Sequence, residues 1–401
     1  MATAPLVRLK SAPWLHEAET QRLFALLDGG DGRTRAVGGI VRDTLLDRMR
    51  ESGEIDFATE LRPEEVMQRA ATAGISAYPT GIEHGTVTLK LGALLAEVTT
   101  LREDVETFGR HATVRFGTDW TRDAERRDFT MNALYVGPDG VLFDPLGGVA
   151  DCLAERVRFI GDPYQRIAED RLRVYRFFRF TASHGREHFD EDGLAAVTRA
   201  AGTLEALSAE RVGGEMRRML GLAKVGRTLG EMRIAGIVDL GAVTIEQLQA
   251  YERHAAKSSF YARLALILAH SGSEGLKLKW RLANDEISTA ERVLATAHLL
   301  IDFRINEAAY RQPAALADAV EVAAALAGWT EAGKGAVVQR LTGVAVAPLP
   351  INGTDLIQAG LRPGPGLGVE LGRLEKLWID SDFQLSREAL LEAVRRPSPH
   401  P

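Results

Sequence analysis

The stretch VGGIVRDTLLDRMRESGEIDFAT, residues Val37 to Thr59, decides how the rest of the chain is interpreted. It predicts the end of a strand, a glycine pair, a short amphipathic helix from Ile40 and a second strand with acidic residues at alternate positions. Because glycine has no β-carbon, a phosphate can approach the backbone N–H groups of Gly38 and Gly39, and the positive end of the following helix faces the same point. Arg42 adds a positive charge one turn into that helix, and we predict that it binds the nucleotide together with Gly38 and Gly39.

Glu54 and Asp56 lie on the second strand, on either side of Ile55. Alternate residues of a strand point to the same face, so both carboxylates face one side while Ile55 and Phe57 face the other. Mg²⁺ prefers hard oxygen ligands, usually one or two carboxylates together with substrate phosphates. Each half of the pattern alone is ordinary, but together the halves predict a nucleotidyl-transfer site in which Glu54 and Asp56 bind Mg²⁺ beside a phosphate-binding turn.

The same residues resemble a known signature. The order GG-x-V-R-D-x-L-L followed by acid-x-D-x-A-T is similar to that of the class II tRNA nucleotidyltransferase and bacterial poly(A) polymerase family, within the DNA polymerase beta superfamily. The resemblance implies a Mg²⁺-dependent nucleotidyltransferase with Glu54 and Asp56 as the catalytic, metal-binding pair. Two positions depart from the family pattern: Glu54 stands where Asp is usual, and Asp47 stands where a Gly usually ends the helix.

Length and composition limit the remaining possibilities. The 401 residues are too many for one ordinary core and predict two to four domains. A net charge of −6 argues against a nonspecific RNA-binding coat and predicts a local basic surface for any nucleic-acid contact. The single cysteine, Cys152, excludes an intramolecular disulfide, and no apolar run approaches the ~20 residues that a membrane helix needs. We therefore expect a cytoplasmic protein without a membrane segment.

Several segments of the first 155 residues have the periodicity of regular elements. Helices are predicted over 14–28 and 63–74, and paired strands over 84–91 and 94–102. Glu97, on the second of these strands, is a candidate third carboxylate near Glu54 and Asp56. The polar residues 102–120 contain glycines and predict a mobile loop, and the family resemblance implies that this loop takes part in the switch from C to A addition.

Residues 126 to 136, RRDFTMNALYV, form the second cluster of charge. Arg126 and Arg127 could neutralise the charge of a triphosphate, and Asp128 could hold one of the two guanidinium groups through a bidentate bond. A bare Arg-Arg-Asp is more often surface charge than a site. As part of the whole block, however, it resembles the second family signature, which implies that Arg127 contacts the nucleotide.

Residues 161 to 180, GDPYQRIAEDRLRVYRFFRF, predict a helix that begins at a proline. Its charged residues recur at intervals of three, close to one side: Asp170, Arg173, Arg176 and Arg179. The ordinary interpretation is a solvated basic stripe. A carboxylate beside a guanidinium, however, presents an acceptor and donors that match the Watson–Crick edge pattern shared by cytosine and adenine.

The segment R-I-x-E-D-x-x-R-x-x-R-x-x-R-F resembles the nucleotide-selecting motif of the same family. The resemblance implies that Asp170 and Arg173 read the base and that Glu169 positions Arg173. It also implies that Arg176 and Arg179 reach the sugar or a phosphate of the nucleotide.

A second pattern points to different chemistry. HGREH, from His184 to His188, has the H-x-x-E-H spacing of a zinc protease. A zinc site of that kind needs both histidines on one helix face, whereas Gly185 and the residues before it predict the end of a helix. The upstream motifs would also stay unexplained, so we do not adopt the zinc interpretation.

The second half of the chain predicts helices. Ser208 predicts the N-cap of a helix in which Arg211 and Glu215 can pair at i,i+4, and helices are expected throughout residues 226–341. Residues 347–379 contain a Gly/Pro-rich turn, RPGPGLG, followed by a helix. They resemble the C-terminal tail of the family, which implies tRNA binding.

Together these patterns predict an α/β plus all-α architecture. We expect a small mixed-sheet nucleotidyltransferase head at residues 1–155, a helical neck with the nucleotide-selecting motif at 156–225, a helical body at 226–343 and a helical tRNA-binding tail at 344–401. The predicted function is template-independent addition of C, C and A to tRNA 3′ ends from CTP and ATP, with release of pyrophosphate. The predicted partners are tRNA, CTP and ATP, without a membrane or an obligate protein partner.

Alternatives stay open at this point. The chain could be a poly(A) polymerase of the same family, although its acidic net charge favours the tRNA enzyme. It could add only A or only CC. It could also be an RNA-binding relative with an impaired catalytic site, for which Glu54 is the supporting residue.

Overall fold

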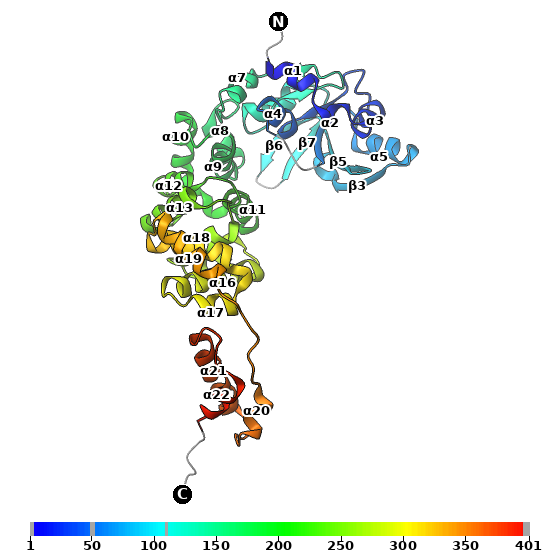
Figure 1. Cartoon of the computed structure of the whole chain (residues 1–401). Helices are drawn as coiled ribbons and strands as arrows, with labels where there is room; N and C mark the ends of the chain where they lie inside the picture. Colours follow the sequence, from blue (N-terminus) through cyan, green and yellow to red (C-terminus); the bar gives the residue numbers. More distant parts are fainter. Residues whose placement is uncertain (1–3, 49–52, 109–110, 396–401) are drawn as a thin grey trace. The chain divides into compact units, whose positions relative to one another are not determined.

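The computed structural model of the chain describes residues 4–48, 53–108 and 111–395 (Figure 1). Contacts divide the chain into two compact units, one of Met1–Glu215 with Glu231–Val238 and one of Met216–Gly230 with Asp239–Pro401. The first unit contains a seven-stranded sheet, and the second is helical. This confirms the predicted combination of a mixed-sheet head with a helical remainder. Among the described residues, no helix is long and apolar enough to cross a bilayer.

The sheet has the strand order β3-β4-β5-β2-β1-β8-β9. Its strands are β1 (Thr34–Val37), β2 (Glu54–Thr59), β3 (Ser76–Gly81), β4 (Thr86–Leu91), β5 (Leu94–Thr100), β8 (Tyr135–Val136) and β9 (Leu142–Phe143). The pair β2 and β5 is parallel, and the other neighbours are antiparallel. The predicted strands β4 and β5 are confirmed. The sequence analysis missed β3 because it contains Pro79, which the ladder tolerates since β3 is an edge strand.

The α-helices described in this region are α1 (Ala4–Lys10), α2 (Pro13–His16), α3 (Ala18–Leu26), α4 (Gly39–Leu45), α5 (Pro63–Thr72), α6 (Trp120–Glu125) and α7 (Gly148–Leu153). The predicted helix over 14–28 is wrong in its continuity, because Glu17 is extended and separates α2 from α3. Asp47, which replaces the usual Gly after α4, adopts the left-handed φ of 60°, a conformation that aspartate tolerates better than most residues.

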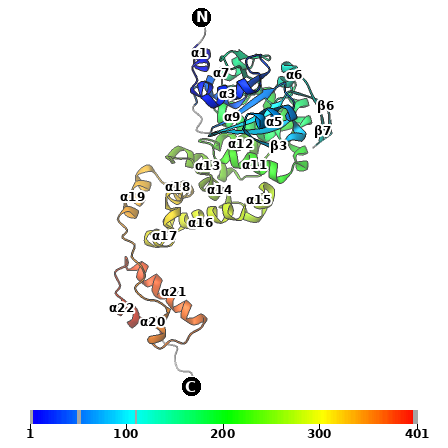
Figure 2. The ribbon, with the colours of Figure 1, turned by 90° about the vertical axis from the view of Figure 1, so that its right-hand side faces the viewer.

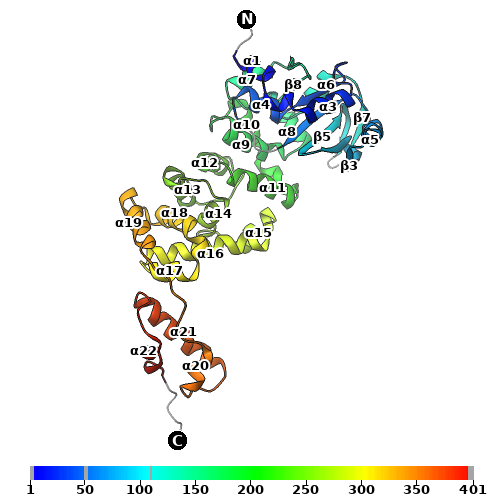
Figure 3. The ribbon, with the colours of Figure 1, turned by 45° about the vertical axis from the view of Figure 1, so that its right-hand side comes forward.

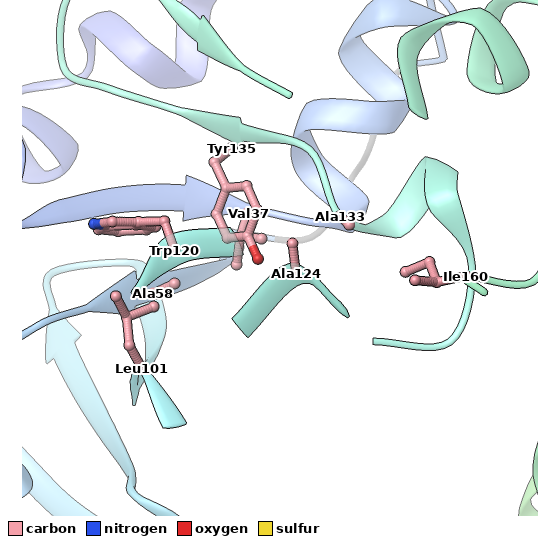
Figure 4. Close-up of a cluster of buried hydrophobic side chains, with 8 residues drawn as sticks. All are labelled: Val37, Ala58, Leu101, Trp120, Ala124, Ala133, Tyr135 and Ile160. Carbon is pink, nitrogen blue, oxygen red and sulfur yellow. The ribbon is translucent and has the colours of Figure 1, made fainter. Parts of the chain in front are cut away.

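The two faces of the sheet differ in what covers them. Phe57 of β2 faces Phe24 of α3 across 5.2 Å between ring centroids, and α5 packs against β3 and β4 on that side. On the other face, Trp120 and Tyr135 belong to a buried hydrophobic cluster that covers β1, β8 and the end of β2 (Figure 4). The start of β2, with β5, β4 and β3, keeps exposed side chains on that second face.

Residues 102–116 form a hairpin of β6 (Arg102–Phe108) and β7 (His111–Phe116). The strands pair antiparallel. The predicted irregular loop is therefore wrong in its secondary structure, while its mobility stays a prediction. A two-stranded ladder needs backbone hydrogen bonds but no apolar face, so a polar composition does not exclude it. Gly109 and Arg110, which follow β6 in the sequence, lie outside the described residues.

The first unit continues with the helices α8 (Pro163–Glu169), α9 (Arg173–His184) and α10 (Glu191–Ala200) and with the start of α11 (Ala209–Leu220), whose last residues belong to the second unit (Figure 3). The single helix predicted after Pro163 is thus broken into α8 and α9. Asp170 is extended at the break, and its Oδ1 accepts the backbone N–H of Leu172 at 3.0 Å. An aspartate that bonds the backbone two residues later competes with helix continuation.

The remaining residues are helical, as predicted: α12 (Gly226–Ile234), α13 (Ala242–His254), α14 (Phe260–Leu268), α15 (Ser273–Trp280), α16 (Asn284–Ile301), α17 (Ile305–Arg311), α18 (Leu316–Ala327), α19 (Glu331–Thr342), α20 (Gly353–Gln358), α21 (Pro365–Asp380) and α22 (Arg387–Glu392). In the second unit, α14, α16 and α18 contact one another (Figure 2). Trp378 of α21 lies in a separate apolar cluster with residues of α20 and α22.

Candidate active site

Strand pairing brings the two halves of the opening stretch together. Because β1 runs antiparallel to β2 and Ala36 pairs with Phe57, the glycine pair after β1 falls beside the beginning of β2. Gly38 adopts φ 72° and ψ −120°, a conformation that side chains rarely reach, and Gly39 begins α4. The predicted phosphate-binding turn and the predicted carboxylates are therefore neighbours.

The carboxylates of Glu54 and Asp56 are exposed on one face of β2, while Ile55 and Phe57 are buried, as the alternation predicted. Glu97 of β5 pairs with Asp56 across the parallel ladder. Partial burial, and then the negative charges of Asp56 and Glu54, raise the pKa of Glu97. The three carboxylates thus share one negative field, although no set of three metal-ligating side chains within the described residues has the geometry of a preformed metal site.

The guanidinium group of Arg127 also lies beside the glycine turn. Its Nη1 lies 4.0 Å from the point that a β-carbon on Gly38 would occupy. Its Nε donates to the Tyr135 hydroxyl at 3.1 Å, and its Nη2 donates to Asp123 at 3.2 Å. Burial disfavours the charged guanidinium, but its interactions with Tyr135 and Asp123 outweigh burial and raise the pKa of Arg127. A fixed positive charge therefore stands beside the turn.

The suggested role of Asp128 in holding Arg126 or Arg127 is wrong. Asp123, which the sequence analysis missed, does this from α6 and also accepts from Nε of Arg126 at 2.8 Å. Its spacing of three and four residues from the two arginines was the available signal. Asp128 instead accepts from Nε of Arg176 at 2.8 Å.

Arg42 is buried, with its side chain 5% exposed. Its Nη1 donates to Oδ1 of Asn132 at 2.6 Å, and its Nε donates to Asp43 at 2.8 Å. Both contacts direct the guanidinium at protein acceptors. The contact of Arg42 with the nucleotide stays a prediction. The hydrogen bonds of Arg42 to Asn132 and Asp43 do not favour it.

A chain of hydrogen bonds links α4 to α9. Each step measures 2.6 to 3.1 Å along the sequence Arg176, Asp128, Asn132, Arg42, Asp43 and His184. Both ends lie on α9, so the backbone of that helix closes the loop. We call these six residues the α4–α9 ring. Burial lowers the pKa of His184 to about 4, so at neutral pH its imidazole group is uncharged and Nε2–H donates to Asp43. The ring fastens the helix of the phosphate-binding turn to the helix of the nucleotide-selecting motif.

Phe180, also missed in the sequence analysis, packs against the α4–α9 ring. The guanidinium groups of Arg42 and Arg176 lie 5.2 Å and 5.4 Å from the centroid of the Phe180 phenyl ring. Helix α9 ends at His184 with Gly185 as its C-cap, as predicted. The H-x-x-E-H residues therefore do not share one helix face, and the structure uses His184 in the ring instead.

The two predicted base-reading residues stand at the start of α9. Nη1 of Arg173 donates to Glu169 at 2.8 Å, so the predicted positioning of Arg173 by Glu169 is confirmed. The backbone N–H of Arg173 donates to the carbonyl of Asp170 at 3.0 Å. Their side chains hold other partners, because Oδ2 of Asp170 accepts from Arg211 at 2.8 Å. The assignment of these two residues to base reading stays a prediction.

The last two predicted contacts also lie in ion pairs. Arg179 donates through Nε to Glu215 at 2.5 Å, whereas Arg176 is held by Asp128. The spacing allowed a pair of Arg211 with Glu215, but the structure shows Asp170 as a partner of Arg211 and Arg179 as a partner of Glu215. Contacts of Arg176 and Arg179 with sugar or phosphate remain predictions.

Comparisons with known proteins show which proteins this chain resembles. A family described as "Poly A polymerase head domain" matches residues 34–158. The chain is 32% identical over 385 residues to the mitochondrial CCA tRNA nucleotidyltransferase 1 of Danio rerio, covering 90% of this chain and 86% of that protein. It is 31% identical to the CCA-adding enzyme of Latilactobacillus sakei, covering 94% of this chain and 98% of that one.

A solved structure gives the same picture. The fold superposes on the Bacillus stearothermophilus CCA-adding enzyme in complex with CTP with a TM-score of 0.76 and 26% identity, covering 94% of this chain and 97% of that chain.

Proposed function

The chain belongs to the family of CCA-adding tRNA nucleotidyltransferases, and we propose that the site between β1, β2 and α9 performs the reaction of that family. The reaction is addition of C, C and A to the 3′ end of tRNA from CTP and ATP, without a nucleic-acid template and with release of pyrophosphate. The partners of the chain are accordingly tRNA, CTP and ATP.

One observation carries this proposal. The pairing of Ala36 with Phe57 sets a glycine turn next to two exposed carboxylates of one strand. The turn with the charge of Arg127 suits a triphosphate, and the carboxylates suit the point at which the α-phosphate reacts. The arrangement therefore has one part for binding a nucleotide and one for transferring it.

We propose that Glu54 and Asp56 hold Mg²⁺. The residues fit this group, since both carboxylates are exposed hard-oxygen ligands and Glu97 of the neighbouring strand β5 pairs with Asp56. When bound, the ion would supply charge stabilisation for the attacking oxygen and the leaving pyrophosphate.

The residues of the chain then have separate roles. Arg127 stabilises the negative charge that accumulates on the triphosphate, and Gly38 and Gly39 let the phosphates approach the backbone. Glu97 is a candidate acceptor for the proton of the tRNA hydroxyl, because its pKa is raised and it lies opposite Asp56. Asp170 and Arg173 select the base by hydrogen bonds that only cytosine and adenine satisfy together.

Substitution of the carboxylates tests the proposal. Asp56→Ala should abolish nucleotide incorporation while tRNA affinity stays nearly unchanged, since the carboxylate acts on the reacting phosphate and not on the tRNA body. Glu54→Asp should keep or raise activity if Glu54 is a ligand. Turnover that survives Asp56→Ala would refute the assignment, and a fully inactive Glu54→Asp protein would show that the site requires the longer side chain.

Some finer assignments belong to the same proposal. We place the boundaries of head, neck, body and tail near residues 155, 225 and 343, and we propose a cytoplasmic location, although the relatives include mitochondrial proteins. The full-length similarity to CCA-adding enzymes favours this activity over poly(A) synthesis.

A further inference from the structure

The carboxylates of β2 stand at the border of an exposed sheet face on which only Glu97 has a proposed role. The strand register extends this face across three neighbouring strands. Leu95 of β5 pairs with Glu54 and with Lys90 of β4, and Glu97 pairs with Asp56 and with Thr88. Tyr78 of β3 then pairs with Thr88. We call this the open face, and it consists of Tyr78, Thr88, Lys90, Leu95 and Glu97.

The open face combines aromatic, cationic and hydroxyl groups that are accessible. Tyr78 and Leu95 are 48% and 37% exposed, and Lys90 is exposed as well. The opposite face of the same strands is buried through Val87 and Leu89. An exposed aromatic ring and a lysine on a sheet form the kind of platform on which single-stranded nucleic acids stack.

The position of this face relative to the nucleotide decides what it can bind. The candidate nucleotide contacts, Gly38 and Arg127, lie on the β1 side of β2, whereas the open face lies on the β5 side. In an in-line displacement at phosphorus, the attacking hydroxyl approaches from the side opposite the leaving pyrophosphate. If the triphosphate lies over the β1 side, the attacking strand must arrive over β5.

We propose that the open face seats the single-stranded 3′ end of the tRNA, with the ring of Tyr78 stacked on one of its bases and Lys90 beside a phosphate. The inference rests on the proposed function and adds the subsite for the second substrate. Stacking suits this substrate because every base has a π-face, so the same ring can hold an end whose sequence changes with each addition.

The distance from the carboxylates predicts which nucleotide Tyr78 contacts. Neighbouring strands lie about 4.8 Å apart, so β3 is about 14 Å from β2, more than the length of one nucleotide. A tRNA that ends in CC has a single-stranded end long enough to reach from β2 to Tyr78. A tRNA that lacks all three nucleotides has a shorter one. The contribution of Tyr78 should therefore grow with the number of nucleotides added.

The test measures KM for two primers with Tyr78→Ala and Tyr78→Phe. For Tyr78→Ala, KM for tRNA ending in CC should rise about 5- to 150-fold, the range expected for loss of one stacked base, while KM for ATP stays at the parent value. The rise for tRNA lacking all three nucleotides should be smaller. Tyr78→Phe keeps the ring and should behave like the parent. Lys90→Gln should reduce the slope of log Kd against log salt by about one.

Val141→Ala provides a matched control, since Val141 is 52% exposed in the turn between β8 and β9 at the opposite edge of the sheet. It should change neither KM. An unchanged KM of Tyr78→Ala for tRNA ending in CC, or an equal rise for both primers, would overturn the proposal. Failure of the proposed function would look different, because the unsubstituted protein would then add no nucleotide to either primer.

Discussion

The buried histidine of the α4–α9 ring makes the stability of the first unit depend on pH. Nε2 of His184 lies 3.1 Å from Asp43, and burial lowers the pKa of His184 from 6.5 to about 4, with the bond to Asp43 offsetting only part of that shift. Between these two values the unfolded chain binds more protons than the folded chain, so stability falls as pH falls. The linkage relation gives a loss of about 2 kcal/mol by about pH 5.

His184→Gln isolates this contribution, because glutamine retains a donor for Asp43 and does not titrate. Asp43 does not interfere, since its own pKa is lowered to about 2 and its contribution is lost only at lower pH. Hydrogen exchange of peptides from α4 and α9 measures the effect locally. From about pH 7.5 to about pH 5, protection in the parent should fall about 30-fold more than in His184→Gln. An equal fall in both proteins would refute the buried, uncharged state of His184.

Three further predictions concern contacts of α8 and α9. In a competition assay, Asp170→Ala should let UTP and GTP compete with CTP and ATP, because loss of the carboxylate acceptor removes about 1–3 kcal/mol of discrimination between the bases. Fully retained selectivity would disprove base reading by Asp170. Glu169→Gln should raise KM for both CTP and ATP with tRNA affinity unchanged, because Glu169 holds Arg173, and a change in KM for only one nucleotide would contradict this role. Asp128→Asn leaves the charge of Arg176 without its carboxylate and should lower the free energy of unfolding by about 2 kcal/mol. This loss is smaller than for a fully buried ion pair because the side chain of Arg176 is one-third exposed. An unchanged melting temperature would count against the α4–α9 ring.

The sequence predicted those parts of the site that depend on local periodicity. Alternation on β2 identified the exposed carboxylates and the buried Ile55 and Phe57, and the glycine pair identified the turn. These features follow from strand geometry and the missing β-carbon, so they are visible in one segment. The helical second half was predictable for the same reason.

The parts that the sequence did not predict depend on contacts between distant segments. Nothing in the spacing of residues 163–184 shows that the carboxylate of Asp170 accepts the N–H of Leu172 and that a helix ends there. The ring joins Asp128, Asn132 and Arg42 across about 90 residues of chain, which no local pattern reports. The edge strand β3, which contains Tyr78, was not predicted because Pro79 is uncommon within a strand.

The most direct test of the central claim incubates the purified protein with a tRNA lacking its 3′ CCA and with each labelled nucleoside triphosphate in turn, then with CTP and ATP together. The site described above predicts that CTP alone extends the tRNA by two residues, that the mixture adds one A after them, and that UTP and GTP are not incorporated. A long tail from ATP alone, or no incorporation from CTP, would contradict it.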